Sequence, residues 1–417
     1  MKKNNFKMSL WAALMLLGSV VMTGCVSEAD EYVSPATGGR TLTININSGA
    51  LGTTRSTDIN NVETAKTNEK KIQNMAIAVF QEDTQDNNTL KLVYYNYLSD
   101  INQSASSGFS TTVDNVSPTT AFAANDWAVI IANTPEDVFA TVKALGTTMA
   151  DFKAASVTIA QALDADNDGD TDSDCLPMYG AVQIVANGAG HLVANVNVGH
   201  MVSKVTLESL KVDGIAAGCS FKPEQVFLYK VADGLTFNLA TENDFSSYLS
   251  PAVTTWYTGE ASQSAEANYA ACLGTKVYTD GDGDLETLDN TTTTWTKQCV
   301  LYAMPNVFAS PTEGNDTRLV IKGTWTDTGT PANTGTCYYN FRLLNVVAGQ
   351  AMEALAYRKL YPNRNYRIKV ILKRKGAESI DAGVTAQAST AVAFNSVSEW
   401  GSGEQSTEFG NNGQTNS

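Results

Sequence analysis

The chain has 417 residues, of which 43% are hydrophobic and only 17% are charged, and its net charge is −15. This apolar content is sufficient for a sizeable core and excludes a wholly disordered chain. The acidic balance makes nucleic acid a poor partner, because proteins that bind polyanions carry basic patches. Since there are only two histidines, a metal or catalytic site built on imidazole groups is not expected.

The first 24 residues have the pattern of an export signal. Three lysines precede a mostly apolar run, Met8–Met22, of 15 residues, which is too short to span a bilayer comfortably. Gly24 and Cys25 follow, as at the cleavage site of bacterial lipoproteins. We therefore predict a signal peptide over residues 1–24 and thioether lipidation of Cys25. The alternative is an ordinary signal peptide followed by an incidental cysteine.

Two further features concern the exported chain. An acidic run, Val26–Glu31, follows Cys25; it resembles the surface-export signal of Bacteroidetes lipoproteins, and a solvated linker is the alternative. Five more cysteines lie downstream, an odd number that leaves at least one unpaired within the chain. We expect buried free thiols or one or two disulfides among Cys175, Cys219, Cys272, Cys299 and Cys337.

Strict alternation of polar and apolar residues predicts a strand over 41–47, in which Leu42, Ile44 and Ile46 share one face. Residues 48–70 then form a polar stretch that contains Arg55. A connection of roughly 20 residues is unusually long for a compact domain and indicates a functional or processed segment.

The body of the chain is predicted to be mostly β, with two antiparallel β-sandwich lobes of transthyretin-like form and one or two short helices. One helix is expected after Thr134 as N-cap and Pro135 as first helical residue, because Val138, Val142 and Leu145 recur at helical spacing. Strands are expected at 75–80, 91–98, 127–133, 181–185, 191–198, 201–212, 225–231, 299–304, 318–325, 336–343 and 366–373.

A last apolar segment, with Val392, Phe394 and Val397, ends at Trp400 and follows the Gly- and Ala-rich linker 376–389. We expect a strand here without an obvious partner in its own chain. The polar tail 401–417 is expected to be disordered. The predicted organisation is a signal peptide (1–24), a propeptide with the first strand (25–55), an N-terminal lobe (56–215), a C-terminal lobe with the terminal arm (216–400) and a tail (401–417).

An acidic segment resembles a calcium loop, because oxygen ligands and a glycine are spaced as in an EF-hand. The twelfth position is Cys175 instead of Glu, so a Ca²⁺ site and a solvated hairpin tip both remain open. No other cofactor is expected. The candidate ligands are Asp164, Asp166, Asp168, Asp170 and Asp172.

No catalytic motif is present: there is no G-x-S-x-G, H-E-x-x-H, P-loop or complete G-x-G-x-x-G. His191 and His200 lie in strand-like stretches and are expected to be surface or core residues. The many carboxylates neither support nor exclude a glycosidase pair. We predict that the protein is not an enzyme.

Several motifs, taken in order, resemble the fimbrillin family, the subunits of Bacteroidales type V pili. They are the Cys25 motif, a strand before Arg55, and the segments Ile72–Phe80, Leu176–Gly180 (LPMYG), Val196–Leu207, Asn363–Tyr366 (NRNY) and Val392–Trp400. The polar tail after Trp400 is longer than is usual in the family.

The resemblance implies a pilus shaft subunit that is exported as a lipoprotein precursor to the outer membrane and cell surface. A protease would cut after Arg55 and free the strand with Leu42, Ile44 and Ile46. The C-terminal arm of a neighbouring subunit, with Val392, Phe394, Val397 and Trp400, would replace that strand. Partners would be other fimbrial subunits, tip and anchor subunits included, and a host protein or glycan. The alternative is a non-polymerising, anchor or tip lipoprotein of the cell surface that binds glycan or host protein.

Overall fold

In the computed structural model, the chain divides into two units, residues 1–38 and residues 39–417. All residues that the structure describes belong to the second unit. They are residues 41–47, 71–86, 88–101, 103–104, 109–113, 121–158, 161, 176–187, 191–250, 278–279, 286–295, 299–307, 316–329, 332–343, 359–380, 391–399 and 409–410. No helix among them is long and apolar enough to cross a membrane.

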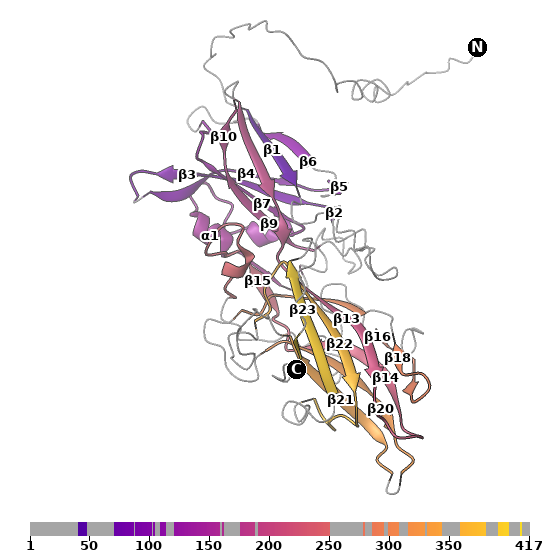
Figure 1. The fold of residues 1–417 in the computed structure, drawn as a ribbon. Coiled ribbons are helices and arrows are strands. Elements are labelled where there is room, and N and C mark those ends of the chain that lie inside the picture. The colour runs from indigo at the N-terminus through magenta and orange to yellow at the C-terminus, as the bar shows by residue number, and fades with distance from the viewer. Residues whose placement is uncertain are drawn as a thin grey trace, which may run out of the picture. The chain divides into compact units, whose positions relative to one another are not determined.

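The predicted mostly-β fold is confirmed, and residues 42–200 supply its first two sheets (Figure 1). One sheet, here called the β1 sheet, has the order β10-β11-β1-β6, and the other has the order β12-β9-β7-β3-β4. The strands are β1 (Leu42–Asn47), β3 (Met75–Asp83), β4 (Thr89–Leu98), β6 (Phe109–Val113), β7 (Trp127–Ala132), β9 (Met178–Gln183), β10 (Val185–Ala186), β11 (Leu192–Asn197) and β12 (Gly199–His200).

Residues from 203 onward supply two more sheets. One has the order β18-β13-β22-β23-β24, with β19 also on β13; the other has the order β16-β14-β20-β21, with β17 also on β14. These strands are β13 (Ser203–Val212), β14 (Ser220–Tyr229), β16 (Tyr278–Thr279), β17 (Leu288–Asp289), β18 (Thr294–Trp295), β19 (Cys299–Ala303), β20 (Arg318–Thr326), β21 (Gly335–Arg342), β22 (Arg364–Leu372), β23 (Ala391–Glu399) and β24 (Phe409–Gly410).

Two short pairs complete the described sheets: β2 (Lys71–Ile72) with β5 (Gln103–Ser104), and β8 (Ser156–Thr158) with β15 (Gly234–Thr236). Nearly all pairings are antiparallel, as predicted, but β1 runs parallel to β11 and β13 runs parallel to β22. The chain passes from the first two sheets to the next two between β12 and β13. The predicted lobe boundary at 215/216 instead follows β13. The domain limits therefore stay a prediction.

The helix predicted after Thr134 is wrong. A single 3-10 turn, η4 (Glu136–Phe139), stands there, and its N-cap is Pro135 without a side-chain cap. Thr134 is buried, and its backbone N–H donates to Asn74 Oδ1 at 2.9 Å, so it belongs to the core after β7. Leu145, the expected end of the apolar stripe, is 69% exposed. Val138 and Val142 still pack partly against the core, but without the predicted helix.

The one α-helix among the described residues is α1 (Met149–Lys153), which the sequence analysis did not predict. Thr148 is its N-cap: the Thr148 hydroxyl accepts a hydrogen bond of 3.0 Å from the backbone N–H of Asp151. The helix buries Phe152 against Phe80, with ring centroids 5.4 Å apart. A second 3-10 turn, η5 (Phe245–Ser247), follows β15.

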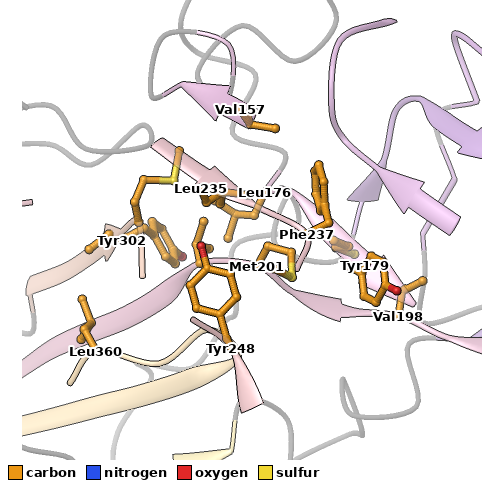
Figure 2. Packing of buried hydrophobic residues seen from close by; sticks show 14 of the residues in the cluster. Val157, Leu176, Tyr179, Val198, Met201, Leu235, Phe237, Tyr248, Tyr302 and Leu360 are labelled. Carbon is orange, nitrogen blue, oxygen red and sulfur yellow. The ribbon is translucent and has the colours of Figure 1, made fainter. Parts of the chain in front are cut away.

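A buried aromatic cluster joins α1 and β9 to the segment after β15. Phe237 stacks on Phe139 and on Tyr179, with ring centroids 6.5 and 6.3 Å apart. Figure 2 shows Phe237 and Tyr179 among the buried side chains around Met201. Beside them, the Glu242 carboxylate accepts hydrogen bonds from Lys153 Nζ and from the Tyr179 hydroxyl. Burial, together with the Glu242 charge, raises the pKa of Tyr179.

The described cysteines agree with the expectation of buried thiols. Cys219, Cys299 and Cys337 are all buried and form no disulfide. Burial raises the pKa of Cys337 and, together with Asp327, that of Cys219. A buried thiol with a raised pKa is a poor nucleophile, so these residues act as small core side chains. Cys25, Cys175 and Cys272 lie outside the described residues.

Candidate functional site

The first strand of the body, β1, occupies an interior position of its sheet (Figure 1). It pairs with β11 on one side through six register partners and with β6 on the other through five. Each neighbour therefore takes up one edge of β1. Removal of β1 would leave β6 and β11 with facing, unpaired edges.

The inner face of β1 is fully buried. Leu42, Ile44 and Ile46 are each 0% exposed and belong to the main hydrophobic core. The prediction that these three side chains share a buried strand face is confirmed. Burial of each side chain is worth about 1.5–3 kcal/mol relative to water, so β1 is held mainly by this face.

The positions beside these side chains differ in size. Leu42 lies between Leu192 and Val113 in the register, and Ile46 lies between Val196 and Phe109. Ile44, in the middle, lies between the smaller Ala194 and Thr111. A strand that replaced β1 would therefore find the least bulky neighbours at its central inward position.

The outer face of β1 carries a polar contact that spans three strands. Asn45 Nδ2 donates to Asn195 Oδ1 on β11 at 2.9 Å, and Asn45 Oδ1 accepts from Ser110 Oγ on β6 at 2.8 Å. The same two residues are the direct register partners of Asn45. We call Asn195, Asn45 and Ser110 the polar rung. The sequence analysis missed it, because nothing local indicates which distant strands flank β1.

The C-terminal strand is paired within its own chain, so the expectation that it lacks a partner is wrong. β23 runs antiparallel to β22 through nine register partners, from Arg364 with Glu399 to Leu372 with Ala391. Among the described residues, its other edge pairs only with the two-residue strand β24, which lies in the tail expected to be disordered. The reason is that β22 has one edge on β13, and its second edge accepts β23.

The remaining predicted site residues are outside the described part of the chain. These are Cys25, Arg55, Trp400 and the acidic loop with Asp164, Asp166, Asp168, Asp170 and Asp172. Lipidation, cleavage and Ca²⁺ binding therefore stay predictions. Of the two histidines, His191 is exposed and His200 is fully buried. Within the described residues, no group of three or more His, Cys, Asp or Glu side chains is arranged to hold a metal ion.

Residues 41–208 match the sequence model of a family described as major fimbrial subunit protein (FimA). The match begins at β1 and extends into β13, and so includes the β1 sheet and its partner sheet. The predicted resemblance to the fimbrillin family is therefore confirmed over residues 41–208. No curated protein matches the sequence.

Solved structures resemble this fold over most of their length. A Parabacteroides distasonis protein with a proposed role in cell adhesion has a TM-score of 0.55 at 16% identity, over 89% of this chain and 100% of its own. A Bacteroides eggerthii protein with a similar description has a TM-score of 0.52 at 18% identity, over 88% and 98%. A fimbrilin from Porphyromonas gingivalis has a TM-score of 0.49 at 13% identity, over 88% and 99%. At these identities the likeness defines the fold.

Proposed function

We propose that the protein is a shaft subunit of a cell-surface fimbrium that mediates adhesion and is assembled by strand exchange. The precursor is lipidated at Cys25, anchored in the outer membrane and cut after Arg55. β1 then leaves its sheet, and the C-terminal strand of a neighbouring subunit takes its place. The observation that carries this proposal is the position of β1: it is a complete interior strand, contributed by the segment that precedes the cleavage position.

The energetics of the β1 sheet support a replacement. Three buried side chains contribute about 1.5–3 kcal/mol each, and each ladder hydrogen bond contributes about 0.5–1.5 kcal/mol. An empty β1 position would expose apolar surface and two strand edges, which favours the addition of another strand. The C-terminal strand has apolar residues at two successive alternate positions, so that both can face the core. It is therefore a suitable replacement.

The pairing of β23 adds a requirement to this proposal. β23 must leave β22 before it can enter the groove of another subunit, which costs nine register pairs. In the part of the chain that the structure describes, the outer edge of β23 pairs only with the two-residue strand β24, so β22 is the main partner that β23 must leave. If β23 stays on β22, the chain acts in the alternative way, as a non-polymerising surface lipoprotein that binds glycan or host protein.

The experiment is limited trypsin treatment of the purified precursor, followed by denaturing gels of unheated samples. We expect an early cut after Arg55 and then a ladder of oligomers. Arg55→Gln should delay both, whereas the matched variant Lys66→Gln, in the same polar stretch, should behave as the parent chain. Deletion of residues 390–417 should allow the cut but abolish the ladder. A ladder that survives this deletion would exclude the C-terminal strand as the donor.

A further inference from the structure

The polar rung constrains any strand that replaces β1. A strand in this position must point alternate side chains into the core, so a slip by one residue is excluded because it would turn the apolar face outward. Slips by two residues keep the apolar face inside. The outer face then distinguishes these registers, because Asn195 and Ser110 flank only one position, that of Asn45.

In one register and direction, the C-terminal strand matches β1 at two of the three inward positions and at the polar rung, with Ser396 in the place of Ile46. With both strands running the same way, Val392, Phe394 and Ser396 fall on the inward positions of Leu42, Ile44 and Ile46. Asn395 then falls on the position of Asn45. In this register, an amide side chain again stands between the Asn195 amide and the Ser110 hydroxyl, and it can both donate and accept.

Two arguments separate this register from its nearest competitor, which is shifted by two residues. The matched register places Phe394 on the central position, between Ala194 and Thr111, whereas the shifted one places it between Val196 and Phe109. The shifted register also brings Ala393 to the polar rung and moves Asn395 past the last residue that pairs with β6. Both the aromatic ring and the amide are therefore better accommodated in the matched register.

We infer that Asn395 is the residue that sets the register of strand exchange, through the polar rung of the receiving subunit, with Phe394 in the central inward position. This inference rests on the proposed strand exchange and adds to it the direction and the register of the incoming strand. The polar rung thus recognises a second copy of this chain through the Asn395 amide, which directly follows the inward-facing Phe394 in the incoming strand.

Disulfide trapping between two full-length variants tests the register directly. In the matched register, residue 393 lies opposite Thr112, and in the shifted register residue 391 lies opposite Thr112. Directly opposed residues are about 4.5–5.5 Å apart at Cα, within disulfide reach. Ala393→Cys protein, mixed with Thr112→Cys protein during trypsin treatment, should give an oxidation-dependent dimer. Ala391→Cys protein with the same Thr112→Cys partner, in which the polar rung is intact, should give little, and the parent chain without added cysteines should give none.

Variants of the amide test its role. In donors that carry either cysteine, Asn395→Ala should reduce the preference for trapping through residue 393 over residue 391 by about fivefold, the equivalent of one hydrogen bond. Ser398→Ala, beyond the six matched positions, is the control and should leave the preference unchanged. Asn195→Ala in the receiving subunit should have the same effect as Asn395→Ala, and it tests the inference even if the donor variant does not fold.

The outcomes separate the two proposals. Trapping mainly through Ala391→Cys, or an unchanged preference in both alanine variants, would overturn the assigned register while strand exchange remained intact. Non-covalent ladders without trapping at either position would overturn the assigned direction. Absence of any ladder from the parent chain would overturn strand exchange itself, and with it this inference.

Discussion

Gly180 on β9 lies directly against the backbone of Asn197 on β11. A Cβ at residue 180 would be 2.4 Å from the Asn197 carbonyl oxygen and 2.8 Å from Val196 Cγ1. β9 and β11 belong to different sheets, so the glycine of the LPMYG motif allows the β1 sheet and its partner sheet to approach closely. The motif therefore has a packing role where β9 meets β11.

Gly180→Ala should therefore destabilise the protein by about 1–3 kcal/mol, because a methyl group against backbone atoms forces the sheets apart. The measurement is the free energy of unfolding from urea denaturation. Gly329→Ala is the matched control: the three atoms nearest to its new Cβ all belong to the half-buried Asp327 carboxylate, at 3.0 Å or more, and none is a backbone atom. Equal effects in the two variants would mean that the approach of the two sheets does not depend on Gly180.

Ile44→Ala should reduce the unfolding free energy of the uncut precursor by about 2–5 kcal/mol, as for other fully buried aliphatic side chains. Thr43→Ala, on the opposite face of the same strand, removes a half-buried side chain and should cost much less. Chemical denaturation of both variants gives the comparison. If the two costs are similar, β1 is not held by its inward face.

Glu242→Gln should destabilise by about 3–5 kcal/mol, because it leaves the buried Lys153 ammonium without its carboxylate. The control is Glu136→Gln, which breaks an exposed ion pair of 2.8 Å with Lys143 and should cost about 0–1 kcal/mol. Thermal and urea unfolding at neutral pH measure both variants. A small cost for Glu242→Gln would show that water reaches Lys153 easily.

Asp316 should make stability depend on acid pH. Burial raises the pKa of Asp316, but hydrogen bonds from Arg318, both 3.1 Å, and the charges of Arg318 and Arg342 outweigh burial and hold the pKa below its usual value. The stabilisation is thus fully present above about pH 4 and is lost as the pH falls through the lowered pKa.

Asp316→Asn should accordingly destabilise by about 3 kcal/mol at neutral pH, and the difference from the parent chain should shrink towards about pH 2. Asp86→Asn, at an exposed ion pair with Lys91, is the control and should change little at either pH. Unfolding free energies across this range provide the measurement. A cost for Asp316→Asn that is the same at both pH values would contradict the assigned charge state.

Most strands could be predicted because local alternation and β-branched runs determine them. β1 was expected at 41–47 and is found at Leu42–Asn47; the expected strands at 318–325 and 336–343 correspond to β20 (Arg318–Thr326) and β21 (Gly335–Arg342). Short strands such as β5, β6 and β8 were missed, since two to five residues carry too little pattern to be recognised.

The errors have physical causes. Helical spacing after Thr134 was misleading because Asn133 adopts a positive φ of 56° and its amide donates to Lys71 O and Leu176 O. These contacts fix the chain after β7 in a turn. The Thr148–Asp151 signal for α1 was present in the sequence, as a threonine three residues before an acid, but the helix is too short to show a periodic face.

The candidate site was only half predictable. The inward face of β1 follows from LTININ alone, but its neighbours do not, because Asn45 and its partners Ser110 and Asn195 are 65 and 150 residues apart in sequence. The pairing of β23 with β22 was missed for the same reason. Local pattern identifies a strand and its face, whereas the identity of its partners depends on the whole fold.

The parallel pairing of β1 with β11 also determines when the β1 sheet can form. β1 is the first strand of the described chain, yet it completes its pairing only once Asn197 is available. A polypeptide that emerges with its N-terminus first can pair β1 with β6 once Val113 has appeared, but the other edge of β1 stays open until β11 has appeared, at nearly half of the chain length. Closure of this sheet is therefore a late, long-range event in folding.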